Sequence, residues 1–203
     1  MKLLDIQHTY SYNWQTITTA NWRKYPNELS SHVLSCDVIS REVDPSTGIL
    51  KTERLLKCKQ NVPYLIRSLA TIPEVSYFRE VSYLDPKTQT YTATTINLSL
   101  TNLLTIREIC TYKPDPSNPN KTLFQQQCMT TAGQSFSAFG KYIEDAAIYK
   151  FGSNASRGRA GLELVINKVL EEVRDVEDKL GRGLETLEKD ILGLFEEKNE
   201  KKL

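Results

Sequence analysis

The chain has 203 residues, a length that fits one domain with an extension or two small domains. Hydrophobic residues make up 39% and charged residues 25% of the chain, as in an ordinary globular protein. A formal net charge of +1 argues against wholesale nucleic-acid binding, which needs a strong positive surplus. No apolar run approaches the ~18 residues of a membrane span. The N-terminus resembles neither a signal peptide nor a mitochondrial presequence, so these local features alone favour the cytosol.

The first two thirds of the chain alternate strand patterns with turn signals. Residues Lys2–Tyr12 predict a strand, and Asn13 or Thr16 predicts the cap of a short helix that ends at Trp22. The segment Pro114–Lys121 is rich in Pro and is predicted to be an irregular loop. About seven strands with short connections predict an antiparallel sheet. The other strand-like runs, rich in β-branched residues, are His32–Val43, Leu50–Lys59, Val75–Leu84, Gln89–Leu100, Leu103–Tyr112 and Thr122–Ala132.

From Ser135 onward apolar residues recur at helical spacing, which predicts a long amphipathic helix. The fold class is therefore α+β: a curved antiparallel sheet of about seven strands wrapped around a long C-terminal helix, with a natural cavity between them. Residues 1–174 are expected to form the folded domain and 175–203 a charged amphipathic helical extension. The apolar face of that extension predicts packing on its own domain or on another chain. The apolar stripe of the helix consists of Leu162, Ile166, Val169, Val173, Val176 and Leu180.

An apolar segment, Asn61–Thr71, interrupts the strand pattern between two predicted strands. Pro63 and Pro73 bracket it and keep it from continuing either strand. So apolar a segment should not lie bare in water. It is either a short helix packed on the core or a lid that closes a cavity and dips into a membrane surface. The candidate lid side chains are Val62, Tyr64, Leu65, Ile66 and Leu69.

Basic residues occur on several predicted elements. Lys57 and Lys59 share one face of their strand, and Arg54 shares the other with Cys58. A buried Arg needs an anion, which is either a ligand phosphate or a structural carboxylate. The candidate carboxylates are Glu53, Glu80 and Glu108.

Two further basic pairs lie elsewhere in the chain. Lys150 and Arg157 lie on one face of the long helix, while Lys24 and His32 bracket the turn after the first helix. Groups that converge from several elements would suit a phosphate headgroup, although each one alone is also explained as a solvated charge. The candidate headgroup-binding residues are Lys24, His32, Arg54, Lys57, Lys59, Lys150 and Arg157.

Residue patterns that mark enzymes and metal sites are missing from the sequence. His8 and His32 lack metal-ligand spacing, no Cys-x-x-Cys pair occurs, and no nucleophile or phosphate-binding Gly motif is present. No catalytic residue, metal or cofactor is therefore predicted, and the cysteines are expected to be small buried hydrophobes. Two alternatives remain open. One is an enzyme that pairs His32 with a carboxylate around a small hydrophobic substrate; the other is a non-transferring adaptor that binds a partner through the long helix.

Several collinear segments resemble one family. The runs NWRKYPNELSSHVLSCDVISREVD, TERLLKCKQNVP, REVSYLDP and KTLFQQQ resemble the PRELI/MSF1 domain, and SNASRGRAGLELVINKV resembles its long final helix. The similarity extends from Met1 to about Arg174. It implies a fold like that of START and phosphatidylinositol-transfer proteins. It also implies a carrier, not an enzyme, that extracts one phospholipid and shuttles it between the outer and inner mitochondrial membranes.

The resemblance further implies a location, partners and site residues. The location is the mitochondrial intermembrane space, and the partners are the phospholipid, anionic membrane surfaces and a small twin Cys-x9-Cys helical-hairpin protein. At matching positions it implies headgroup contacts and a lid at Asn61–Thr71, although Cys58 stands where some members have Lys. The motifs KYPNE and KTLFQQQ resemble the Slowmo-like branch, which implies phosphatidylserine ahead of phosphatidic acid. The matching headgroup positions are Lys24, His32, Arg54, Lys150 and Arg157.

Overall fold

The structure is a computed structural model that describes residues 1–59 and 72–200, without the side chains of 135, 137, 183, 185 and 187–200. The chain forms two compact units, Met1–Val165 and Ile166–Leu203. None of the described helices is long and apolar enough to cross a membrane. The predicted lid, Asn61–Thr71, lies outside the described residues.

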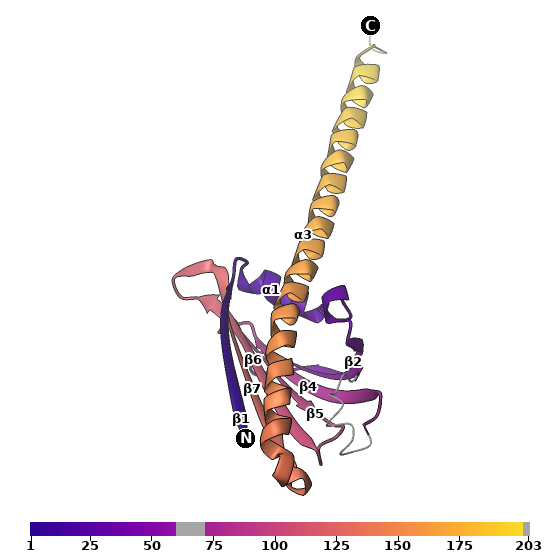
Figure 1. Cartoon of the computed structure of the whole chain (residues 1–203). Helices are drawn as coiled ribbons and strands as arrows, with labels where there is room; N and C mark the ends of the chain where they lie inside the picture. Colours follow the sequence, from indigo (N-terminus) through magenta and orange to yellow (C-terminus); the bar gives the residue numbers. More distant parts are fainter. Residues whose placement is uncertain (60–71, 201–203) are drawn as a thin grey trace. The chain divides into compact units, whose positions relative to one another are not determined.

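The first unit contains a seven-stranded antiparallel sheet with the order β1-β7-β6-β5-β4-β3-β2 (Figure 1). Every neighbour in this order except the β1–β7 pair is also a neighbour in sequence, so short turns join most strands. The predicted antiparallel sheet is confirmed. The strands are β1 (Lys2–Tyr10), β2 (Val33–Val43), β3 (Leu50–Lys59), β4 (Val75–Asp85), β5 (Thr90–Asn97), β6 (Leu104–Asp115) and β7 (Asn118–Ala132).

Three hairpin turns of the sheet begin with an Asp-Pro pair. The carboxylates of Asp44, Asp85 and Asp115 each accept a backbone N–H from two residues further on, at 2.8 to 2.9 Å. Hydroxyl groups of nearby Ser or Thr also donate to these carboxylates and lower their pKa. In the first turn Gly48 has a φ of 80°, a conformation that favours glycine.

The prediction of an irregular loop over Pro114–Lys121 is wrong. Strand β6 continues to Asp115 and β7 begins at Asn118, so only two residues form the turn. The strand register shifts between Pro114 and Asp115, and such an irregularity accommodates a proline that has no N–H to donate. The Asp-Pro-Ser sequence at 115–117 then repeats the turn chemistry of 44–46.

Helix α1 (Trp14–Trp22) covers one end of the sheet. Asn13 caps it, because its side chain accepts the N–H of Thr16 at 2.9 Å. The indole Nε1 of Trp14 donates to the carbonyl oxygen of Tyr112 at 3.2 Å, which ties α1 to β6. Below α1 lie the rings of Tyr10, Tyr91, Tyr112 and Phe124, all at most 3% exposed. We call the sheet face that carries these rings the inner face.

Helix α3 (Gly140–Glu200) runs without interruption through Gly152, Gly158 and Gly161. Its first part packs at the end of the sheet, where Ile143 contacts Leu103 in the turn before β6. Glu144, in the same turn of α3, accepts the N–H of Ala132 at 2.9 Å and pairs with the N-terminal ammonium at 2.8 Å.

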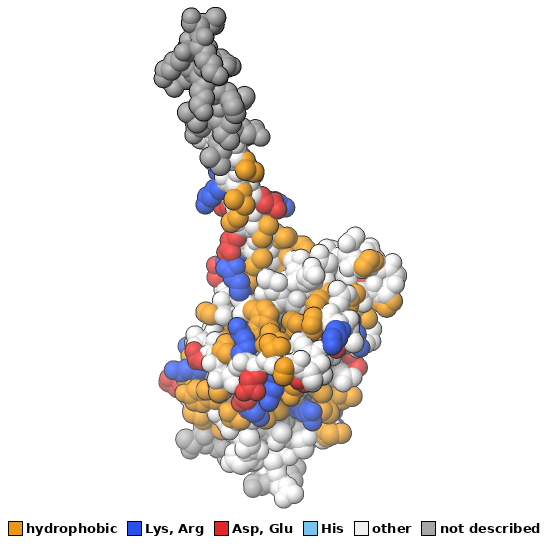
Figure 2. Space-filling model, turned by 180° about the vertical axis from the view of Figure 1, so that it is seen from behind, with side chains coloured by type: hydrophobic (Ala, Val, Ile, Leu, Met, Phe, Trp, Pro, Cys, Tyr) orange, Lys and Arg blue, Asp and Glu red, His pale blue; other side chains and the backbone are white. Residues whose placement is uncertain are grey.

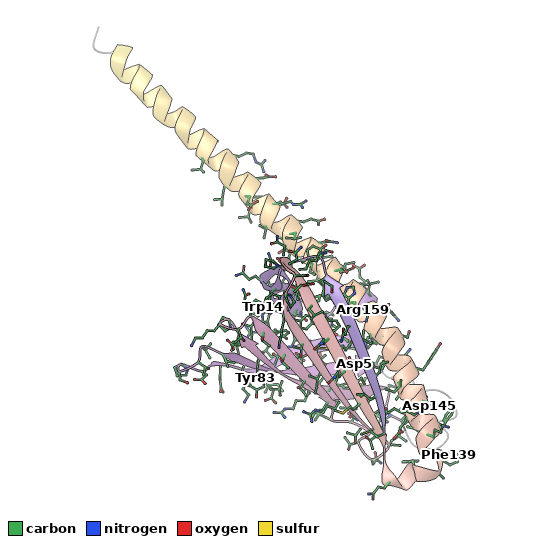
Figure 3. The ribbon with its side chains drawn as sticks, turned by 90° about the vertical axis from the view of Figure 1, so that its left-hand side faces the viewer. Asp5, Trp14, Tyr83, Phe139, Asp145 and Arg159 are labelled. Carbon is green, nitrogen blue, oxygen red and sulfur yellow. The ribbon has the colours of Figure 1, made fainter. Side chains whose placement is uncertain are left out.

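Strand β1 runs beside this part of α3. Lys2 pairs with Asp145 at 2.9 Å, and His8 Nε2 lies 3.9 Å from Glu163. Figure 3 shows Asp145 and Arg159 along α3 beside the strand that carries Asp5. The first part of α3 is therefore held to the β1 edge of the sheet by charged contacts as well as by packing.

The second unit is the continuation of α3 from Ile166. The predicted apolar stripe is helical, but several of its members are exposed: Val173 at 49%, Val176 at 55% and Leu180 at 63%. What this stripe packs against stays a prediction.

The loop after α1 approaches α3 closely at a glycine. Asn27 caps the short helix η1 (Glu28–Ser30): its Oδ1 accepts the N–H of Ser30 at 2.8 Å and its Nδ2 donates to the Lys24 carbonyl at 2.6 Å. A methyl group on Gly161 would lie 2.9 Å from that Oδ1, closer than real contacts allow. Because two hydrogen bonds hold the Asn27 amide, it has little freedom to give way.

We expect Gly161→Ala to lower the free energy of unfolding by about 1–3 kcal/mol, the usual cost of overpacking. Gly181→Ala is the matched control, since a Cβ at Gly181 meets nothing within 4 Å. The control should be neutral or stabilising by up to about 1 kcal/mol, the helix propensity of Ala over Gly. Urea unfolding measures both variants. Equal stability changes for the two glycines would contradict the close contact with Asn27.

Candidate functional site

A row of polar side chains crosses the inner face at the middle of the sheet. The strand register places Glu108 opposite Thr95, Thr95 opposite Glu80, and Glu80 opposite Arg54. Residues opposite each other on neighbouring strands point to the same face, so these four side chains form one band, which we call the polar row.

Arg54 and Glu80 form a buried ion pair within the polar row. Arg54 is 3% and Glu80 8% exposed. The guanidinium donates to Glu80 Oε1 from Nε at 2.8 Å and from Nη2 at 2.6 Å, and Nη1 donates to the Asn21 carbonyl at 3.3 Å. Burial alone would lower the pKa of Arg54, but the Glu80 carboxylate raises it above its ordinary value. The structural-carboxylate alternative is therefore confirmed for Arg54, and its contact with a lipid stays a prediction.

Three other predicted basic residues lie within electrostatic reach of His32. His32 has a lowered pKa, caused first by burial and then by the positive charges of Arg157, Lys150 and Lys24. His32 and Lys24 are half-buried, whereas Lys150 and Arg157 on α3 are exposed. We call His32 and these three cations the basic cluster; their convergence on a lipid headgroup stays a prediction.

Lys24 links the basic cluster to the polar row. Its Nζ lies 5.1 Å from the centre of the Tyr25 ring and would lie 3.9 Å from a Cβ on Gly158 of α3. Burial acts to lower the pKa of Lys24, yet the pKa is raised overall by Tyr25, Cys110, Tyr10 and Glu108. Of these four groups Glu108 is the carboxylate. Lys24, whose pKa is raised, therefore lies within electrostatic reach of one carboxylate.

The centre of the inner face keeps accessible surface. On β6 the inner-face residues Ile106, Glu108 and Cys110 are only half-buried, although β6 is a central strand of the sheet. The same face is closed towards α1, where Tyr112 is 2% exposed. The sheet, α1 and the first part of α3 therefore leave apolar and polar groups of the inner face partly uncovered.

Lys57 and Lys59 do not join the basic cluster. Burial along β3 alternates strictly, with Thr52, Arg54, Leu56 and Cys58 buried on the inner face. Lys57 and Lys59 occupy the opposite face, where they are half-buried and exposed. Figure 2 shows the side of the molecule turned away in Figure 1, where basic and acidic side chains are interspersed. The structure thus gives these two lysines no shared site with His32.

Sequence analysis missed one member of the site, Gln126 of β7. Its Nε2 donates to Glu108 Oε1 at 2.5 Å, and Cys110 Sγ donates to the same oxygen at 3.3 Å. Gln126 alternates with Phe124 and Cys128, which are both buried. A polar residue at an apolar position of an alternating strand was the available signal.

All four cysteines are free. The expected burial is found for Cys58 and Cys128, whereas Cys36 and Cys110 are only half-buried. Burial raises the pKa of the Cys58 thiol to about 11 and that of Cys128 to about 12, so both stay protonated. Among the described residues no group of His, Cys, Asp and Glu is arranged to hold a metal ion.

Arg54→Met should cost about 3–5 kcal/mol of unfolding free energy, because it leaves the buried Glu80 carboxylate unpaired. The double variant Arg54→Met, Glu80→Met should recover most of that loss, since no charge is then buried. Arg79→Met is the control: Arg79 pairs with Glu53 on the same two strands, but on the outer face. We expect a much smaller effect there, because solvent screens exposed pairs. Urea unfolding that ranks the two arginines equally would contradict the buried pair.

The sequence matches one protein family over most of its length. Residues 15–173 match the PRELI-like family. The chain is 38% identical over 185 residues to "Protein UPS2, mitochondrial" of Saccharomyces cerevisiae, covering 91% of this chain and 80% of that protein. It is 37% identical over 170 residues to "Protein slowmo homolog" of Dictyostelium discoideum, covering 84% and 73% of the two chains.

Solved structures of low sequence identity share the fold. A START superfamily protein from Mycobacterium smegmatis has a TM-score of 0.51 at 15% identity, over 82% of this chain and 98% of that chain. The Zhui aromatase/cyclase from Streptomyces has a TM-score of 0.54 at 8% identity, over 83% and 95%. The curved sheet with its long helix is thus a START-like fold. By the sequence matches, the chain belongs to the PRELI-like family.

Proposed function

We propose that this protein extracts one phospholipid molecule from a membrane, holds it against the inner face of the sheet and carries it to a second membrane. The observation that carries the proposal is the position of three cations, Lys24, Lys150 and Arg157, within electrostatic reach of the half-buried His32. A concentration of positive charge at the border of a partly uncovered inner face fits an anionic headgroup with apolar chains.

A lipid carrier needs both an apolar surface for the acyl chains and positive charge for the headgroup. Two acyl chains of roughly sixteen carbons lose about 25 kcal/mol of apolar transfer free energy on entering water, at ~0.8 kcal/mol per methylene. The inner face offers half-buried apolar side chains on β1 and β6, such as Leu4, Ile6 and Ile106. The basic cluster would meet the phosphate, which accepts charge-assisted hydrogen bonds from Lys and Arg.

The finer parts of the proposal follow from the family. We propose phosphatidylserine as the preferred cargo and phosphatidic acid as the next. We also propose transport between the outer and inner mitochondrial membranes, since one relative is named mitochondrial. Anionic membrane surfaces and a small twin Cys-x9-Cys helical-hairpin protein are the proposed partners. The proposed cycle contains no chemical step.

The enzyme alternative gains no support from the site. It required a carboxylate beside His32 to form an acid-base pair. The groups that shift the pKa of His32 by their charge are instead all cationic: Arg157, Lys150 and Lys24.

The pKa of His32 gives a direct test for a bound phosphate. In the free protein it is depressed below 6.5, so the folded state binds the proton less readily than the unfolded chain. Stability should therefore be full above pH 6.5 and should fall as the pH drops towards the folded pKa. A lipid phosphate would offset the neighbouring cations and raise the pKa of His32. NMR titration of the imidazole with and without lipid measures this, and an unchanged midpoint with lipid bound would contradict the proposed phosphate position.

Charge reversal on α3 tests the transfer function itself. We expect Lys150→Glu combined with Arg157→Glu to reduce transfer of phosphatidylserine between liposomes at least 10-fold, because the phosphate then faces two carboxylates. Both residues are exposed, so the fold should persist by circular dichroism. Lys51→Glu combined with Lys113→Glu, on the outer faces of β3 and β6, is the charge-matched control and should transfer normally. Equal loss in the control would show a general charge effect at the membrane instead of a site.

A further inference from the structure

Glu108 and Gln126 form a hydrogen-bonded pair on the inner face that has more hydrogen-bond acceptors than donors. Glu108 Oε1 already receives the Gln126 amide at 2.5 Å and the Cys110 thiol at 3.3 Å. Gln126 is only 6% exposed, and its Oε1 has no hydrogen-bond partner among the described residues. A buried amide oxygen without a donor costs free energy, so a further donor near this pair would be favourable.

Glu108 is the member of the pair that a ligand can reach. It is half-buried, and it lies on a central strand of the sheet in the polar row. The other carboxylate of the row, Glu80, is already neutralised by Arg54 at 2.6 Å. Among the described residues none forms an ion pair with Glu108, although its charge raises the pKa of Lys24 and of Tyr25. One accessible carboxylate is therefore left beside the basic cluster.

We propose that Glu108, oriented by Gln126, receives the ammonium group of an amine-bearing phospholipid headgroup and so selects such lipids over phosphatidic acid. The proposal rests on the proposed lipid-carrier function. The phosphate lies at the basic cluster, and the ammonium group lies across Lys24 from it, at Glu108. An ammonium brings three N–H donors, which match the oxygens of the Glu108 carboxylate. Phosphatidic acid has no such group and leaves the carboxylate unmatched.

Glu108 also affects the binding of the lipid phosphate, because both groups are negatively charged. A carboxylate close to a phosphate repels it unless a cation lies between them. Lys24 remains charged and lies within electrostatic reach of both Glu108 and His32. Glu108 therefore penalises a headgroup that is only anionic, and the penalty disappears for a headgroup with its own cation.

The test is Glu108→Gln, which keeps the shape of the side chain and removes its charge. Transfer of phosphatidylserine and of phosphatidic acid is measured between liposomes of otherwise identical composition. We expect phosphatidylserine transfer to fall about 10-fold, the value of one charge-assisted hydrogen bond. Phosphatidic acid transfer should stay within about twofold or rise. Glu42→Gln on the exposed edge strand β2 is the control and should change neither rate.

Gln126→Leu provides a second variant in which Glu108 keeps its charge but loses its orienting donor. We expect a smaller loss, again confined to phosphatidylserine. If either variant slows both lipids equally and also lowers the melting temperature, Glu108 is a structural partner of Lys24 and the proposal is wrong. An unchanged ratio of the two rates with intact stability also overturns it. A wild-type protein that moves neither lipid would instead refute the lipid-carrier function itself.

Discussion

The contact between Asn27 and Gly161 determines where the charged groups of this protein meet. Asn27 lies between Lys24 and His32 in sequence, and its amide is fixed by hydrogen bonds to both sides of the loop. Because α3 has no side chain at Gly161, the loop lies directly against the helix. Lys24 then lies near Gly158, one turn from Gly161 on the same helix. Without this approach the loop cations and the helix cations would belong to separate surfaces.

The charged groups of the site are of two kinds: the paired Arg54 and Glu80, and the basic cluster around His32. Arg54 and Glu80 satisfy each other in a buried pair, which fixes β3 to β4 and, through the Asn21 carbonyl, to α1. Among the described residues no carboxylate pairs with His32, whose pKa is lowered first by burial and then by the three cations near it. Arg54 therefore serves the fold, whereas His32 and the cations around it form a group suited to an anionic ligand.

Much of this architecture was predictable from the sequence, because its local signals agree. Strand alternation alone predicts that Arg54 and Cys58 lie on the face opposite Lys57 and Lys59. Which of the two faces points inward depends on where α1 and α3 pack, and that is tertiary information. The prediction of an irregular loop at Pro114–Lys121 was wrong because it took each proline as the end of a strand. The Asp-Pro-Ser at 115–117, identical to 44–46, was the stronger signal, since it specifies a turn by a hydrogen bond.

Gln126 shows why the sequence could suggest a site but not its specificity. Its position between Phe124 and Cys128 marks it as a polar residue on a buried face, yet nothing local names its partner. The partner, Glu108, is on another strand and comes within 2.5 Å only through the β6–β7 register. The proposed recognition of a ligand amine depends on the pairing of Glu108 with Gln126. Without Gln126 to orient it, the Glu108 carboxylate would be free to pair with Lys24 instead. The amide that orients Glu108 makes this carboxylate a candidate for selecting one headgroup over another.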